Sequence, residues 1–406
     1  MELLALAIPF FLLLMGMEYY FSTQKGKKYY KFTDTVSNLS IGIFDRLCGL
    51  IFAGSFYFVY QFLHKHFALF TINQHYWQWI LLFVLVDFLW YWYHRFSHTV
   101  NIFWAQHVVH HSSTEFNFAV GTRITIFQSF VRMLFWCILP VVGFPAEMIL
   151  GILAIHGAYS FFTHTRTIGK LGFLEKIIVT PSHHRVHHAS NEEYIDKNYG
   201  GFFIVWDKLF GTFAEEKEAV VFGLTTPLKS KSFLWQLFHL WVHLYFEFKS
   251  KINSAEKLKI VFGKPVLLSK KTQILAEKRF LSAKAVGKIS TLFKKYVVFQ
   301  MALSLVCITF LIYFWNYLNV STQIFSSLLL IITLVNCGAV MEQLSWVFDL
   351  ELFRGLILLV YLSYDFPETF AINTFVALLA LTFYTYIKEQ YFSYYLLPTN
   401  KVGKTN

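Results

Sequence analysis

The chain has 406 residues, of which 56% are hydrophobic and only 15% charged, and it carries a net charge of +11. Soluble domains average about 45–50% and 25% in the same two classes. With a mean hydropathy of +0.48, the composition excludes a disordered chain and argues strongly against a soluble enzyme. Aromatic residues make up 20% of the sequence, and their side chains suit lipid-facing and interfacial positions. We therefore expect an all-α polytopic integral membrane protein, built as a helical bundle.

Apolar runs follow one another along the chain, and each is a candidate membrane helix. They cover residues 3–17, 39–63, 77–93, 124–142, 148–162, 296–318, 324–340, 353–364 and 371–387. The runs at 124–142 and 148–162 are short enough to form a hairpin. Glu2 stands where a secretory signal would carry basic residues, so the first run is expected to remain as a helix. Lys25, Lys27, Lys28 and Lys31 follow it, and the positive-inside rule places them in the cytosol.

The excess positive charge is confined to one segment. Residues 165–295 contain 22 Lys and Arg against 11 Asp and Glu, a net of +11 that equals the charge of the whole chain. The aromatic stretch 233–248 lies inside this segment. We expect an interfacial helix beside a basic loop on an anionic cytoplasmic leaflet. A folded basic module for nucleic acid is not evident, so no nucleic-acid partner is predicted.

Histidines are concentrated in the middle of the chain, where 11 of the 16 fall between positions 94 and 188. Eight of them form three clusters with helical spacing: His94 and His98; His107, His110 and His111; and His184, His187 and His188. On a helix, positions three and four apart share one face. Eight imidazoles exceed the four ligands of a tetrahedral zinc and suit two metal ions. So many ionisable side chains at the cytoplasmic ends of membrane helices indicate a functional site.

Two carboxylates stand at helical distances from these clusters. Asp87 precedes His94 by seven residues, and Glu115 follows His111 by four. Either could orient an imidazole through its second nitrogen. An equally good alternative is an interfacial carboxylate paired with a cation such as Arg95.

Longer stretches around the histidines resemble a known family. They read DFLWYWYHRFSH at 87–98, WAQHVVHHSS at 104–113, TPSHHRVHH at 180–188, IDKNYG at 195–200 and WDKLFGT at 206–212. The pattern is similar to the membrane fatty acid hydroxylase/sterol desaturase superfamily, and most closely to its alkylglycerol monooxygenase branch. The resemblance implies a di-iron centre held by the eight clustered histidines. It adds His164, in FFTHT at 161–165, as a ninth ligand. Asn198 is implied to hold a metal-bound water, and its alternative is a turn residue that caps the backbone.

The resemblance also implies a domain organisation. We predict N-terminal transmembrane helices in 1–76, a fatty acid hydroxylase-type catalytic domain in 77–215, a basic cytosolic or interfacial segment in 216–295 and C-terminal transmembrane helices in 296–406. The active site would face the cytosol from a multi-pass protein of a bacterial inner membrane or the endoplasmic reticulum.

The activity implied is oxidation of glyceryl ether lipids by O2 with two irons per chain and tetrahydrobiopterin as reductant, releasing a fatty aldehyde and a glycerol derivative. The alternative within the superfamily is a fatty-acyl, sterol or carotenoid hydroxylase or desaturase that takes electrons from an external protein. A metal transporter is a third interpretation, since intramembrane histidines can line an ion path. The clusters lie at helix ends on one side rather than at the midplane, which argues against transport.

Overall fold

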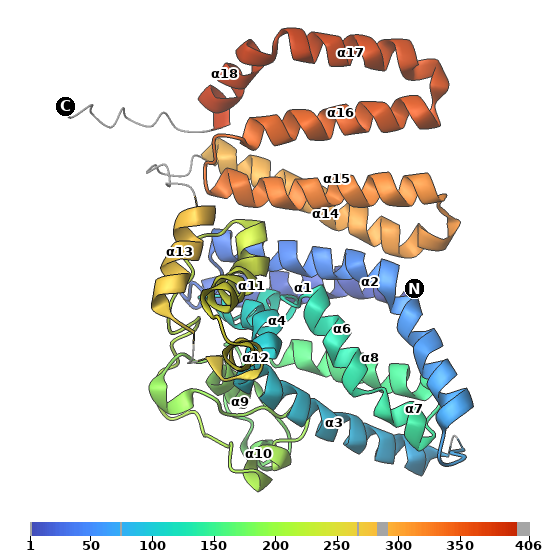
Figure 1. The fold of residues 1–406 in the computed structure, drawn as a ribbon, viewed down its shortest axis with the longest axis vertical. Coiled ribbons are helices and arrows are strands. Elements are labelled where there is room, and N and C mark those ends of the chain that lie inside the picture. The colour runs from blue at the N-terminus through green and yellow to red at the C-terminus, as the bar shows by residue number, and fades with distance from the viewer. Residues whose placement is uncertain (1, 74, 266–267, 282–290, 396–406) are drawn as a thin grey trace, which may run out of the picture. The chain divides into compact units, whose positions relative to one another are not determined.

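The computed structural model describes residues 2–73, 75–265, 268–281 and 291–395, and within these ranges the chain folds into helices and loops without a β-strand. It divides into two compact units (Figure 1). The larger unit comprises residues 9–229 and 237–279, and the smaller one residues 1–8, 230–236 and 280–406. The predicted all-α architecture is confirmed for the described residues.

The larger unit contains the predicted N-terminal runs as helices. Its elements are α1 (Glu2–Gln24, mostly in this unit), α2 (Phe32–Phe67), α3 (Tyr76–Thr99), α4 (Asn101–His111), α5 (Phe118–Gly121), α6 (Ile126–Phe135), α7 (Ile138–Val142), α8 (Ala146–Phe162), α9 (Pro181–His187), α10 (Val205–Leu209), α11 (Phe233–Ser250, shared with the smaller unit), α12 (Ser254–Phe262) and α13 (Lys270–Phe280). The two runs expected to form a hairpin fold as α6, α7 and α8, and α7 packs against α8. The aromatic stretch at 233–248 forms α11.

An apolar core joins α2, α3, α7 and α8. Leu82 and Val86 of α3 and Ile149 of α8 are fully buried in it, together with Trp136. The Trp136 indole donates a hydrogen bond to the Val86 carbonyl over 3.4 Å. Apolar side chains thus fix the middle of α3, and this places the histidines near its C-terminal end.

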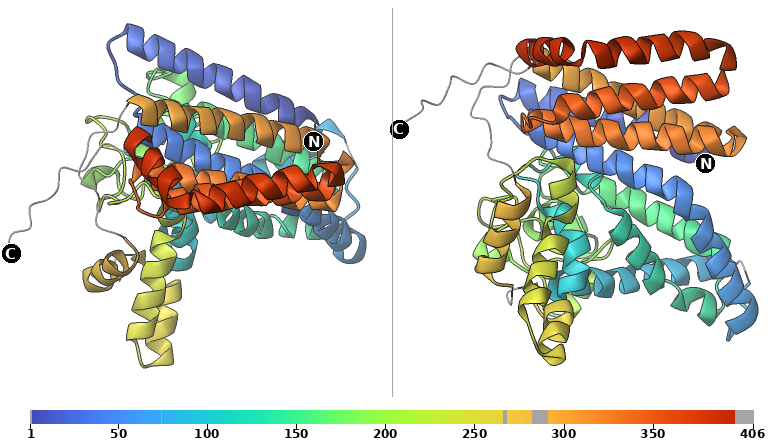
Figure 2. Two further views of the ribbon diagram at one scale, coloured as in Figure 1. Left: turned by 90° about the horizontal axis from the view of Figure 1, so that it is seen from above. Right: turned by 45° about the horizontal axis from the view of Figure 1, so that its top comes forward.

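The smaller unit contains α14 (Thr291–Phe314), α15 (Val320–Met341), α16 (Val347–Asp365), α17 (Phe370–Thr382) and α18 (Tyr384–Tyr395). Successive helices α14 to α17 pack against one another, as the two views of Figure 2 show. The expectation of one continuous helix over 371–387 is wrong, because α17 and α18 are separate helices bent by 75°. The aliphatic run ends at Leu381, and the following Thr382 to Tyr386 are polar or aromatic.

Two described helices, at Thr291–Tyr317 and Val320–Met341, are long and apolar enough to cross a membrane. The count rises to four if each bent pair, within α2 and across α17 and α18, is one span. The helices at Ile126–Val142 and Ala146–Phe162 are apolar but shorter.

Candidate metal centre

Histidines from four places in the larger unit converge. Helix α3 carries His94 and His98, and α4 carries His107, His110 and His111. His164 follows the C-terminal end of α8, while α9 carries His184 and His187 and ends at His188. The helical spacing expected from the sequence is therefore realised in all three clusters.

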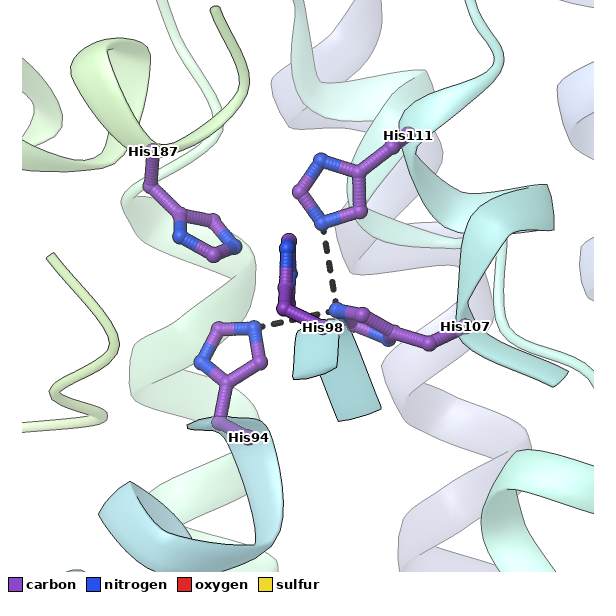
Figure 3. A group of neighbouring side chains, drawn as sticks. All are labelled: His94, His98, His107, His111 and His187. Carbon is purple, nitrogen blue, oxygen red and sulfur yellow. Dashed lines mark hydrogen bonds between the residues drawn. The ribbon is translucent and has the colours of Figure 1, made fainter. Parts of the chain in front are cut away.

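The nine side chains form two groups. Within each group, all potential ligand atoms lie within 4.8 Å of one another. We call these groups site A and site B. Site A contains His94, His98, His107, His111 and His187, as Figure 3 shows. Site B contains His110, His164, His184 and His188.

Within each site the Nε2 atoms crowd together. In site A, His107 Nε2 lies 3.0 Å from His94 Nε2 and 3.1 Å from His111 Nε2. In site B, His164 Nε2 lies 3.2 Å from His110 Nε2 and 3.0 Å from His184 Nε2. Lone pairs that point at a common centre are the arrangement a metal ion needs.

Main-chain carbonyls fix the tautomer of four of these histidines through Nδ1. The pairs are His94 with Tyr199 (2.8 Å), His187 with Lys197 (2.9 Å), His110 with Arg123 (3.2 Å) and His164 with Ser160 (2.7 Å). A carbonyl only accepts, so Nδ1 carries the proton and Nε2 is left as a free lone pair. This is the usual orientation of metal-binding histidines.

Burial keeps the imidazoles neutral. It lowers the pKa of His184, His187 and His188 well below 6.5, and repulsion from neighbouring histidines lowers these pKa values further. Within the described part of the chain, the Nε2 atoms of His98, His187 and His188 are buried without a hydrogen-bond partner. Such orphaned acceptors are costly unless a ligand satisfies them. The donor set therefore fits a metal ion in each site.

Sites A and B are adjacent. The rings of His111 in site A and His188 in site B stack with centroids 4.3 Å apart, and His110 neighbours His111 on α4. Five nitrogens at one site and four at the other can serve two metal ions. Imidazole donors suit iron, zinc and copper.

Asp87 does orient an imidazole, but it is that of His156, which belongs to neither site. The Asp87 carboxylate lies 2.7 Å from His156 Nε2. It also accepts hydrogen bonds from the main-chain N–H groups of Phe202 (2.6 Å) and Phe203 (2.9 Å) and from the Trp206 indole (2.9 Å). Asp87 is therefore an anchor for the loop that follows residue 200.

Glu115 and Asn198 make the contacts expected of their alternative roles. Those roles are an ion pair for Glu115 and a cap of the backbone for Asn198. Glu115 pairs with Lys31 at 2.5 Å and with Arg166 at 2.6 Å. Asn198 has φ of 56°, and its side chain accepts from the Ala214 N–H at 2.9 Å and donates to the Ala214 carbonyl at 2.8 Å. It also donates to the carbonyl of His183 at 3.1 Å.

Asp207 is a residue that reasoning from the sequence missed. Its carboxylate accepts from the main-chain N–H groups of Tyr199 and Gly200 and from the Thr212 hydroxyl, each at 2.7 Å. Because the Tyr199 carbonyl holds His94, Asp207 acts on site A through this loop. Burial raises the pKa of Asp207 to about 6. Its position in the WDKLFGT stretch was the available signal.

A cavity adjoins both sites. Its lining includes His94 and His107 of site A and His110, His164 and His184 of site B. The rest of the lining is Trp90, Ile124, Gln128, Arg132, Ser160, Thr163 and the glycines at 121, 157, 200 and 201. A molecule held there lies directly beside the histidines.

Comparison with known proteins agrees with this arrangement. The fatty acid hydroxylase family model matches residues 79–212, a range that holds all nine histidines. Alkylglycerol monooxygenase of Homo sapiens is 34% identical over 87% of this chain and 81% of its own length, and that of Xenopus tropicalis is 33% identical over 84% and 77%. An ornithine lipid hydroxylase of Rhizobium tropici is 29% identical over 41% of this chain and 54% of its own. No solved structure matches significantly.

Proposed function

Because the chain belongs to the alkylglycerol monooxygenase family, we propose that it is an integral membrane monooxygenase of glyceryl ether lipids. The observation that carries the proposal is the convergence of nine histidines into sites A and B. Relatives that match over most of the chain are alkylglycerol monooxygenases, and this chain has a cluster of histidines suited to a metal-dependent oxidation.

Sites A and B each hold one iron in this proposal, with His94, His98, His107, His111 and His187 as ligands in the first and His110, His164, His184 and His188 in the second. Bound iron would supply O2 activation. The protein holds the imidazoles neutral by burial and oriented by carbonyls. Among the residues that the structure describes, neither group includes a carboxylate, so the proposed donor set is all nitrogen.

The reaction follows from the substrate. One oxygen atom of O2 enters the C–H bond of the alkyl carbon next to the ether oxygen, and the other leaves as water with two protons and two electrons. The product is a hemiacetal, which breaks at the carbon–ether oxygen bond into a fatty aldehyde and a glycerol. Tetrahydrobiopterin is proposed as the two-electron donor, on the strength of the family alone.

The roles of Asp87, Glu115 and Asn198 are proposed from their contacts. Asp87 and Asn198 hold the loop whose carbonyls orient His94 and His187. Glu115 fixes the segment after α4 through two cations. Each is therefore proposed as a positioning residue.

The site is proposed to face the cytosol, with the domain boundaries predicted from the sequence. The support is the lysine cluster after the first helix and the net charge of +11 in residues 165–295, because basic segments stay on the cytoplasmic side. The lipid substrate would come from the membrane in which the apolar helices lie.

A second candidate is a lipid hydroxylase or desaturase fed by an external electron-transfer protein. The specific observation in its favour is the similarity to an ornithine lipid hydroxylase, whose name gives another lipid as its substrate.

The test is product analysis. Membranes that contain the protein are incubated with a 1-O-alkylglycerol, 18O2 and tetrahydrobiopterin, and fatty aldehyde and free glycerol are measured. We expect both products, with 18O in the aldehyde trapped before exchange with water. Membranes with the His187→Ala protein serve as the control. Hydroxylated acyl chains without aldehyde would support the second candidate and overturn the first.

A further inference from the structure

Two polar side chains of α6 lie in the cavity beside sites A and B. Gln128 and Arg132 are four residues apart, so they share one face of the helix. Both line the cavity together with histidines of both sites. Neither is close in sequence to a histidine cluster, and neither was singled out by the sequence motifs.

One polar side-chain atom of each of these residues lacks a hydrogen-bond partner among the described residues. Gln128 is only 3% exposed, and its side-chain oxygen Oε1 has no hydrogen-bond partner. The Arg132 Nε atom is also buried without a partner. No ion pair of the described part of the chain includes Arg132. A buried polar group left without a partner costs about 1–3 kcal/mol, so a bound molecule that satisfies both groups gains affinity.

Aromatic rings and glycines surround the pair. The Arg132 guanidinium lies 5.5 Å from the ring centroid of Trp90 and 5.8 Å from that of Trp136. Cation–π contacts stabilise the charge but leave the N–H donors in the guanidinium plane free. Gly157 and Gly201 contribute no side chain to the lining. The cavity therefore combines space with an N–H donor and an oxygen acceptor.

The donor and acceptor together select a kind of ligand. A hydroxyl group can accept from the Arg132 guanidinium and donate to Gln128 Oε1. A phosphate would satisfy Arg132 but would present another acceptor to Gln128 Oε1. The uncharged diol of an alkylglycerol matches both partners.

We propose that Gln128 and Arg132 bind the hydroxyl-bearing glycerol end of the ether-lipid substrate and set the specificity of the site. This inference rests on the proposed function. Because the cavity adjoins the histidines of both sites, holding the glycerol there keeps the alkyl carbon next to the ether oxygen near them. The pair acts in substrate binding and is not required for holding the metals.

The test separates binding from turnover. Purified protein with its metal is titrated without O2 or reductant with a radiolabelled 1-O-alkylglycerol, and Kd is measured for wild type, Gln128→Met and Arg132→Met. Gln61→Met, an exposed glutamine on α2, is the matched control. We expect Kd to rise about tenfold in each cavity variant, the effect of losing about 1.4 kcal/mol. The control should bind as wild type does, and all four proteins should contain the same amount of iron.

Turnover adds a specificity readout. Wild type should prefer an alkylglycerol to the corresponding alkyl propyl ether, which lacks both hydroxyls, by about tenfold or more in kcat/KM, since unpaired polar groups penalise the analogue. In Gln128→Met and Arg132→Met this preference should fall towards one, mainly through KM for the alkylglycerol. A change in KM for tetrahydrobiopterin alone would assign the pair to the reductant and overturn the proposal.

The experiments distinguish failure of the proposed binding role from failure of the proposed reaction. Unchanged Kd and unchanged preference in both variants overturn the role of the pair. If Arg132→Met loses iron, Arg132→Lys decides, because it keeps the charge: weaker binding with normal iron supports the proposal, and loss of iron again shows a structural role and overturns it. Failure of wild type to form aldehyde, despite tight alkylglycerol binding that needs Gln128, contradicts the proposed reaction but not the binding site.

Discussion

At the scale of single residues, the site depends on which nitrogen of each histidine is free. His187 belongs to site A and His110 to site B, and the Nδ1 of each is held by a carbonyl. Replacing one ligand leaves the remaining nitrogens in place but opens the coordination of one metal. The two sites can therefore be tested separately.

We expect His187→Ala and His110→Ala each to abolish aldehyde formation, by more than about 100-fold, and to lower iron content. Membrane insertion should be unchanged because apolar helices determine it. His243→Ala is the control, since this histidine bonds to the Ser269 carbonyl at 2.9 Å and belongs to neither site. The measurements are iron per chain and aldehyde per minute. Substantial turnover in either ligand variant would contradict the assignment.

Asp207 tests how far the site extends beyond the ligands. In Asp207→Asn, one of the two carboxylate oxygens that receive the Tyr199 and Gly200 N–H groups becomes an N–H donor. The loop should then release the carbonyl that orients His94. Partners of this kind typically change metal affinity by about 10–100-fold.

The measurement for Asp207→Asn is the chelator concentration that removes half of the iron. Glu215→Gln is the matched control, because this carboxylate is half exposed and pairs with Lys170 on the surface. Equal iron retention by wild type and Asp207→Asn would show that the loop is held without the carboxylate.

Residue spacing predicted that eight of the nine converging histidines lie in clusters, whereas His164 was added by the family resemblance, and spacing did not predict which groups support them. The repeats around His107 and His184 have helical periodicity, and this alone predicts that each cluster shares a face. Every residue has a carbonyl, so nothing in the sequence marks those of Lys197 and Tyr199 as partners of imidazoles. Asp87 was predicted either to orient an imidazole of the clusters or to pair with a cation, and its contact with His156 could be identified only from the fold.

At the scale of elements, apolar runs predicted the helices well, because a helix buried in lipid or in the protein interior needs a long run of apolar residues. The run at 371–387 was predicted as one helix, whereas α17 and α18 are bent by 75°. Hydropathy measures the length of an apolar run, and it does not register where main-chain direction changes. The packing of α9 against α4, which joins the triplets, depends on contacts between distant segments that one sequence does not reveal.

The loop between residues 197 and 203 is expected to tolerate almost no added volume at Gly201. A Cβ there would lie 2.3 Å from the His156 ring and 2.7 Å from that of Trp90. Both rings are buried, so they have little room to move. Gly201→Ala should destabilise the protein by about 1–3 kcal/mol and weaken iron binding.

The readouts for Gly201→Ala are the midpoint of thermal unfolding in detergent and iron per chain. Gly169→Ala provides the control, because a Cβ at this exposed loop position meets nothing within 4 Å. A Gly201→Ala protein as stable as wild type, with full iron, would show that the loop adapts.

At the scale of the whole molecule, the smaller unit has its own polar core. Arg354 of α16 donates to Gln300 of α14 and to Thr333 of α15, each at 2.9 Å, and it pairs with Glu351. Asn336 of α15 donates to the same carboxylate. Polar residues between apolar helices fix how those helices associate.

Removing one member of this ion pair should destabilise the protein more than removing both members. Arg354→Met leaves the partly buried Glu351 carboxylate without its cation, and such a loss typically costs about 1–3 kcal/mol. The double variant Arg354→Met with Glu351→Gln should recover much of the stability. Thermal unfolding midpoints in detergent give the comparison, and equal midpoints for the single and double variants would show that the pair is not coupled.

The source of electrons distinguishes the two enzyme proposals for the whole protein. The four cysteines lie at positions 48, 137, 307 and 337, so the chain lacks the closely spaced thiolates of an iron–sulfur protein, and it has no GxGxxG fingerprint for a flavin or nicotinamide. Both proposals therefore take the reductant from outside this chain. With purified protein, tetrahydrobiopterin and O2 alone, we expect cleavage of an alkylglycerol to fatty aldehyde. If pterin gives no product, whereas a ferredoxin with its reductase restores turnover, the electrons come from a protein partner, and the pterin assignment fails while the two-metal site stands.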